Sequence, residues 1–127
     1  MHSRILIDTS VLIAFDRDNS KSLQELIKLK FTQSAELYIS PLTEYEYFIG
    51  VPKSKKAQER SLLRFKELER ISLSGNIGQL AASLSQKYGT DAFDALLAAT
   101  AITENLQLAT LNQKHFKIIK ELKLWGK

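Results

Sequence analysis

Residues 4–15 read RILIDTSVLIAF, and this stretch decides the fold class. Its run of aliphatic residues stops at Asp8, which predicts a short buried strand with an acid at its carboxyl end. Thr9 or Ser10 is expected to cap a helix that begins directly afterwards. A strand followed at once by a helix is the first half of a βαβ unit, so the stretch predicts a parallel sheet.

The same alternation continues along the chain. Helices are expected over residues 20–31, 41–50, 56–70, 75–88, 91–104 and 114–119, and strands over 37–40, 71–73, 106–110 and 122–125. The helical spacing predicts these inward-facing side chains: Leu42, Tyr45, Phe48 and Ile49 in the 41–50 helix, and Leu62, Phe65 and Leu68 in the 56–70 helix. No low-complexity tract or long Gly/Ser linker divides the chain. We therefore expect one domain over residues 1–127, with a mostly parallel sheet between two layers of helices.

Composition excludes several classes of protein. The chain has 127 residues, 44% of them hydrophobic and 25% charged, which matches an ordinary globular domain. It has no cysteine, so disulfides, cysteine zinc sites, iron–sulfur clusters and a thiol nucleophile are ruled out. Its apolar runs are too short to span a membrane, and the first residues do not resemble a secretory signal. A cytoplasmic protein with no membrane partner is expected.

Positive charge is concentrated in one part of the sequence. The formal net charge is +4, and the stretch from Lys53 to Arg70 alone holds seven basic and three acidic side chains. Lys56, Arg60 and Arg64 recur at four-residue intervals, so they share one helix face. A charged helix face is often simply solvated, but this clustering also suits contact with RNA phosphates or a protein partner. The candidate contact residues are Lys53, Lys56, Arg60 and Arg64.

Acidic and polar side chains follow the predicted strands. In parallel sheets flanked by helices, ligands bind beyond the carboxyl ends of the strands. The candidates at that edge are Asp8, Glu44 and Asp94, with Asn112 and Thr110 after the 106–110 strand and Asp91 at a helix start. Asp94 is the most informative, because it shares a helix face with Leu97 and Ala98 and few basic residues are expected near it. A carboxylate on a buried face is costly unless it is paired or binds a metal.

A divalent cation would offset that cost. Converging carboxylates repel one another, and Mg²⁺ or Mn²⁺ prefers carboxylate oxygens together with phosphate and water. Such a site next to basic helices suits metal-assisted hydrolysis of a phosphodiester. Other chemistries are poorly supported, since the chain has neither a complete phosphate-binding glycine motif nor a Gly-x-Ser-x-Gly element.

Four segments make the chain resemble the PIN-domain ribonucleases, especially the VapC-type toxins of toxin–antitoxin pairs. They are residues 5–13 (ILIDTSVLI), 40–44 (SPLTE), 94–101 (DALLAATA) and 108–116 (LATLNQKHF). The resemblance implies a Rossmann-like three-layer α/β/α sandwich, Mg²⁺- or Mn²⁺-dependent cleavage of RNA, a homodimer and inhibition by a small antitoxin protein. Asp8, Glu44 and Asp94 match the family's acidic positions, and Asn112 stands where many members have a fourth acid.

These residues define the functional hypothesis. Asp8, Glu44 and Asp94 would hold the metal and, with Asn112 orienting water or ligands, would form the catalytic site. Supporting residues would be Thr9, Ser10, Asp91 and Thr110. Two alternatives stay open: a PIN-like module that binds RNA or protein with weak catalysis or none, and a phosphatase or phosphoacceptor domain with Asp8 as nucleophile.

Overall fold

A computed structural model describes residues 2–126 and contains a four-stranded parallel sheet. The strand order is β3-β2-β1-β4. The strands are β1 (Ser3–Ile7), β2 (Ala35–Ile39), β3 (Glu69–Arg70) and β4 (Gln107–Ala109). The helices are α1 (Thr9–Asp18), α2 (Lys21–Phe31), α3 (Pro41–Ile49), α4 (Lys55–Arg64), α5 (Ile77–Tyr88), α6 (Ala92–Thr103) and α7 (Gln113–Phe116). None of these helices is long and apolar enough to cross a membrane.

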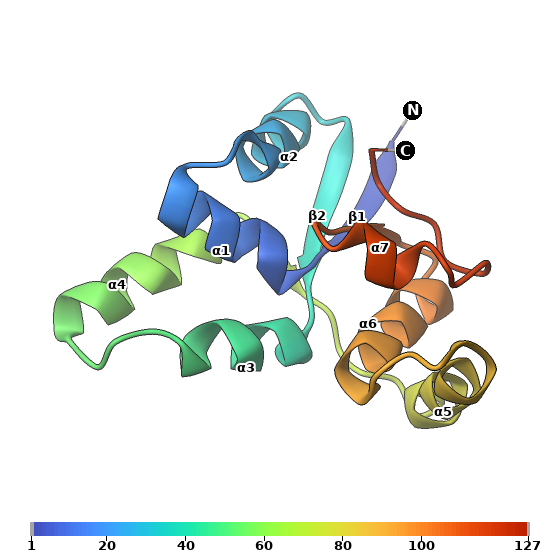
Figure 1. Cartoon of the computed structure of the whole chain (residues 1–127). Coiled ribbons are helices and arrows are strands. Elements are labelled where there is room, and N and C mark those ends of the chain that lie inside the picture. The colour runs from blue at the N-terminus through green and yellow to red at the C-terminus, as the bar shows by residue number, and fades with distance from the viewer. Residues whose placement is uncertain (1, 127) are drawn as a thin grey trace.

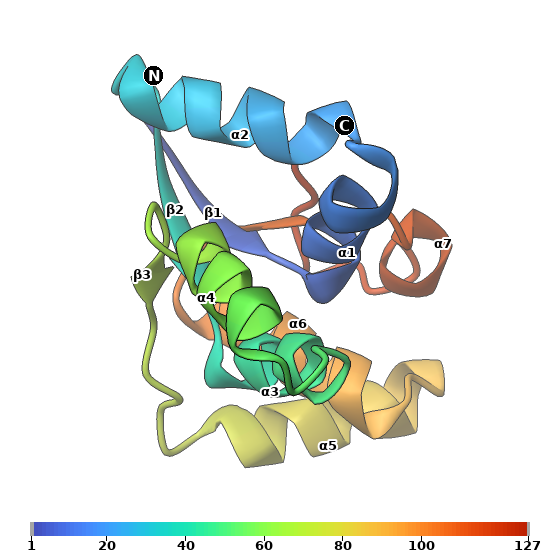
Figure 2. The same cartoon turned by 90° about the vertical axis from the view of Figure 1, so that its left-hand side faces the viewer.

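The sheet separates two layers of helices, as the alternating pattern predicts. Helices α1 to α4 lie on one side of the sheet, and α5 and α6 lie on the other (Figure 1). Successive residues of β1 serve the two layers in turn: Ile5 and Ile7 pack with α1, α2 and α3, whereas Leu6 packs with α5 and α6. Strand β3 forms the edge of the sheet beside β2 (Figure 2). The predicted three-layer α/β/α sandwich is confirmed.

Short polar residues begin the helices at the edge of the sheet where the strands end. Ser40 caps α3 by accepting a hydrogen bond from Leu42 N–H at 3.0 Å, and Pro41 occupies the first helical position, as the sequence predicts. Asp91 caps α6 by accepting from Asp94 N–H at 2.9 Å. The cap of α1 is Asp8 rather than Thr9 or Ser10. The helix starts therefore fix the positions of several candidate site residues.

Three elements differ from the sequence prediction. The helix expected over 56–70 ends at Arg64, and the chain then turns so that Phe65 and Leu68 enter the core. The third strand therefore pairs with β2 at Glu69–Arg70, two residues earlier than expected. Both strand residues are exposed, so no hydrophobic run marks this edge strand. The expected strand over 122–125 is reduced to one parallel bridge between residues 108 and 124.

The inward faces of α3 and α4 were also predicted incorrectly in part. Tyr45 and Ile49 are mostly exposed, and Tyr47 instead enters the core with Thr43. On α4, Leu62 is 59% exposed, while the smaller Ser61 is buried and lets the helix approach its neighbours. The prediction counted only apolar side chains, but each buried face includes a polar residue, Thr43 on α3 and Ser61 on α4.

Candidate metal and active site

Asp8 is the most firmly held residue of the site. It follows β1, is buried, and its backbone N–H donates to the carbonyl of Ala109 at 2.9 Å. Its Oδ1 accepts from Thr9 N–H at 2.8 Å. Its Oδ2 accepts from the hydroxyls of Ser10 at 2.9 Å and Thr110 at 2.7 Å. Three donors thus fix this carboxylate in one orientation.

The same hydroxyls position the loop that follows β4. The Ser10 hydroxyl accepts from Leu111 N–H at 3.0 Å, and the Thr110 hydroxyl accepts from Asn112 N–H at 3.0 Å. Because Ser10 and Thr110 each both donate and accept, they join the start of α1 to residues 110–112. This network holds Asn112 close to Asp8, at the edge of the sheet where the strands end. The side-chain hydroxyl of Thr9 is buried without a hydrogen-bond partner in the described part of the chain.

Asp94 lies in the first turn of α6 and is partly buried. Its pKa is raised from 3.8 to about 6, mainly because burial penalises the charged carboxylate and also because Asp91 and Asp8 lie nearby. Contrary to the expectation of few basic neighbours, His115 Nδ1 lies 3.5 Å from Asp94 Oδ2. His115 only partly offsets these effects. Binding of a proton or of a cation would therefore stabilise the Asp94 carboxyl group in this position.

Glu44 does not join this group. Its Oε1 accepts a hydrogen bond from Arg70 Nε at 2.7 Å, so it pairs with strand β3. Glu46, two positions further along α3, lines the same cavity as Asp8 and Asp94. A helix turns about 100° per residue, so the two glutamates flank opposite sides of the buried stripe formed by Thr43 and Tyr47.

The acidic cavity has a volume of about 400 Å³ and lies beyond the carboxyl ends of β1 and β4. Its polar lining includes Asp8, Ser10, Arg17, Asp18, Glu46, Asp94 and Asn112. The structure thus brings together three of the four side chains predicted to be catalytic, and on α3 it is Glu46, not Glu44, that lines the cavity with them. The prediction took Tyr45 rather than Tyr47 as an inward-facing residue of α3. With Tyr47 on the buried face, Glu46 would have been the adjacent acid to consider. Arg17 and Asp18 were not anticipated, because the sequence hypothesis considered only residues directly after the strands and in the first turns of the helices.

The donor set suits a hard divalent cation. Carboxylate and amide oxygens are the ligands that Mg²⁺ and Mn²⁺ prefer, and a cation would relieve the repulsion that raises the pKa of Asp94. Within residues 2–126, no three His, Asp or Glu side chains already converge on a single point. Coordination of one cation by Asp8, Glu46 and Asp94 would therefore require side-chain movements.

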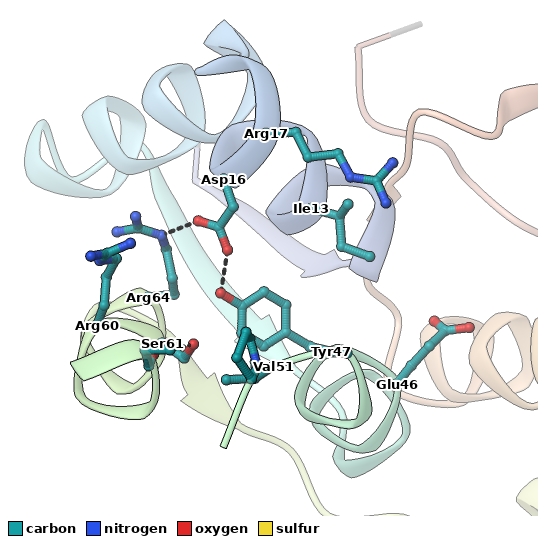
Figure 3. Close-up of a pocket in the computed structure, with 12 residues that line it drawn as sticks. Ile13, Asp16, Arg17, Glu46, Tyr47, Val51, Arg60, Ser61 and Arg64 are labelled. Carbon is teal, nitrogen blue, oxygen red and sulfur yellow. Dashed lines mark hydrogen bonds and ion pairs between the residues drawn. The ribbon is translucent and has the colours of Figure 1, made fainter. Parts of the chain in front are cut away.

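A second hollow, of about 420 Å³, lies between α1, α3 and α4 (Figure 3). Two predicted contact residues, Arg60 and Arg64, line it, whereas Lys53 and Lys56 do not. The carboxylate of Asp16 lies between Tyr47 and Arg64, and it accepts hydrogen bonds from the Tyr47 hydroxyl and from Arg64 Nε. Burial, reinforced by Asp16, raises the pKa of Tyr47 to about 12.

Comparison with known proteins gives the family. The PIN domain model matches residues 5–122. The chain belongs to the PIN-domain family. It is 36% identical to ribonuclease VapC1 of Methanocaldococcus jannaschii, over 98% of this chain and 89% of the relative, and 30% identical to ribonuclease VapC1 of Rickettsia felis, over 94% and 93%. A solved structure of VapBC2 from Rickettsia felis, bound to a DNA fragment from their promoter, superposes with a TM-score of 0.79 at 29% identity, covering 95% of this chain and 96% of that one. These matches place the chain among the VapC-type PIN-domain proteins.

Proposed function

We propose that this PIN-domain protein is a Mg²⁺- or Mn²⁺-dependent endoribonuclease and the toxin of a toxin–antitoxin pair. One observation carries the proposal: Asp8, Glu46 and Asp94 come from three separate elements and line one cavity together with Asn112. The relatives named ribonuclease VapC support the reaction class. The proposed ligand set differs from the sequence hypothesis only in placing Glu46, not Glu44, at the metal.

The residues of the site would divide the work. Asp8, Glu46 and Asp94 would hold the cation, which when bound polarises a phosphoryl oxygen and lowers the pKa of water. Three hydrogen-bond donors keep Asp8 aimed at the cavity, so its orientation needs no adjustment on binding. Asn112 contributes an amide that can accept from or donate to water without adding charge. His115 Nδ1, 3.5 Å from Asp94 Oδ2, would pair with that carboxylate when the imidazole is protonated.

Two glutamates on the same helix provide a matched test. Glu46→Gln should abolish RNA cleavage in Mn²⁺, whereas Glu44→Gln, which removes the same charge two residues away, should retain it. Cleavage of a labelled RNA is measured in Mn²⁺ and in EDTA, with thermal unfolding as a check on folding. Full activity of Glu46→Gln, or equal loss in both variants, would contradict the assigned ligand set. Equal wild-type cleavage in Mn²⁺ and EDTA would contradict metal dependence.

A PIN-like binding module without turnover is the second candidate. The amide of Asn112 favours it, because an amide adds no negative charge where a fourth acid would strengthen metal binding. Such a module should bind RNA without cleaving it under any metal condition. The phosphoacceptor alternative is disfavoured, because Ser10 stands where an Asp-x-Asp pair beginning at Asp8 would have its second acid.

The proposal includes two protein partners. The solved VapBC2 complex supports an antitoxin partner for this chain. We also propose a homodimer, for which exposed apolar side chains on α3 and α4 provide surface: Tyr45, Ile49, Leu62 and Leu63. Sedimentation of the purified chain at several concentrations tests the dimer, and a monomer throughout would contradict it. We also propose that the protein acts in the cytoplasm, where its RNA substrate would be present.

A further inference from the structure

The hollow between α1, α3 and α4 adjoins the acidic cavity. Ile13, Arg17 and Glu46 line both spaces, so they form a shared wall. In Figure 3, Arg17 and Glu46 lie on one side of the hollow, and Arg60 lies on the opposite side with Arg64. A molecule that extends out of the acidic cavity past Arg17 therefore enters a space bordered by arginines.

The charges around the hollow are only partly compensated. Asp16 has both oxygens engaged, one by Arg64 and the other by the Tyr47 hydroxyl. Arg64 is further held with its guanidinium carbon 4.7 Å from the centre of the Phe15 ring. These contacts make Asp16 and Arg64 a structural pair that links α1 to α4.

Arg17 and Arg60 remain available. Both residues are exposed, and within residues 2–126 neither makes an ion pair or a side-chain hydrogen bond. Tyr47, whose raised pKa keeps it protonated, adds no charge to the wall. The hollow consequently presents two uncompensated guanidinium groups beside an acidic cavity.

We infer that this hollow is a phosphate subsite, in which Arg17 and Arg60 bind RNA phosphates on one side of the phosphodiester that is cleaved. The inference rests on the proposed function and deepens it by giving the path of the substrate. RNA is a continuous polyanion, so an acidic cavity needs adjacent cations to retain it. Guanidinium groups form paired, charge-assisted hydrogen bonds with phosphate oxygens. Contacts of this kind position the strand without reading its sequence.

Binding measurements on a double variant test the subsite. The Arg17→Gln/Arg60→Gln protein should bind a short fluorescent single-stranded RNA about tenfold or more weakly, since two charge-assisted contacts are lost. The slope of log affinity against log salt concentration should fall by about 1.4, the value for two single-strand phosphate contacts. Anisotropy is recorded in EDTA, so the result does not depend on cleavage.

The control removes the same charge elsewhere. Lys28 and Lys123 are exposed, line neither cavity and make no ion pair within the described residues. Lys28→Gln/Lys123→Gln should change RNA affinity much less than the arginine pair. Equal losses in the two double variants, or unchanged RNA binding by the arginine variant, would overturn the subsite. An inactive wild type that still shows the arginine-dependent binding would instead overturn the proposed cleavage and leave the subsite in place.

Discussion

Replacing Asp94 by asparagine should stabilise the metal-free protein while destroying its response to metal. Folding raises the pKa of Asp94 from 3.8 to about 6, so the folded state holds this proton more tightly than the unfolded state. The folded protein therefore loses stability as the pH rises from about 4 to above 6. Asparagine has nearly the same shape and no charge, so it removes this penalty at neutral pH.

The magnitude follows from the pKa. Each pKa unit corresponds to about 1.4 kcal/mol, so the rise to about 6 sets an upper bound of about 3 kcal/mol. The Asp94 side chain keeps 24% of its surface in water, and solvent screening lowers the expected gain to about 1–2 kcal/mol. For a domain of this size that gain raises the melting temperature by roughly 3–10 °C.

Thermal unfolding in EDTA at pH 7.5 and pH 4 measures the effect. Asp94→Asn should melt above the wild type at the higher pH, and the gap should narrow at the lower pH. Saturating Mn²⁺, at a hundred times its dissociation constant, should stabilise the wild type by about 2.7 kcal/mol and the variant far less. A variant that is less stable than the wild type in EDTA, or that gains equally from Mn²⁺, would refute the reasoning.

Three further substitutions probe other parts of the structure. Thr110→Val removes the 2.7 Å hydrogen bond to buried Asp8 and should lower the free energy of unfolding by about 1–3 kcal/mol in urea titrations. A change below about 0.5 kcal/mol would show that this hydroxyl does not support Asp8. Phe65→Ala should cost about 3–5 kcal/mol in urea titrations, because Phe65 is 7% exposed. Leu62→Ser should cost under about 0.5 kcal/mol in dilute monomer, and comparable losses at both positions would mean that α4 presents a different face to the core.

The parallel sheet and the acids beyond its strands were predictable because strong local signals mark them. A buried aliphatic run that stops at Asp8 predicts a strand and its end, and the nearly all-apolar α6, which has Asp94 in its first turn, is equally clear. Glu44 was the natural choice on α3 because it lies in the first helical turn. The side of α3 that faces the cavity depends on Tyr47 packing against Phe65, which is a long-range contact.

The second hollow could not be predicted for a similar reason. It depends on where α4 ends and on the pairing of Arg64 with Asp16, residues that are 48 positions apart. The sequence marks Arg60 and Arg64 as equivalent members of one basic stripe. In the folded protein they differ, because Arg64 is bound to Asp16 whereas Arg60 is exposed.

The hydrogen bond between Thr110 and Asp8 joins residues that are 102 positions apart. During synthesis, β1 emerges from the ribosome long before β4, because Thr110, the partner of Asp8, is added 102 residues later. Until Ala109 pairs with Ile7, neither Thr110 nor Asn112 has a fixed place beside the first strand. A nascent or truncated chain that lacks β4 therefore has no assembled acidic cavity, and the cavity forms only after this strand has been synthesised.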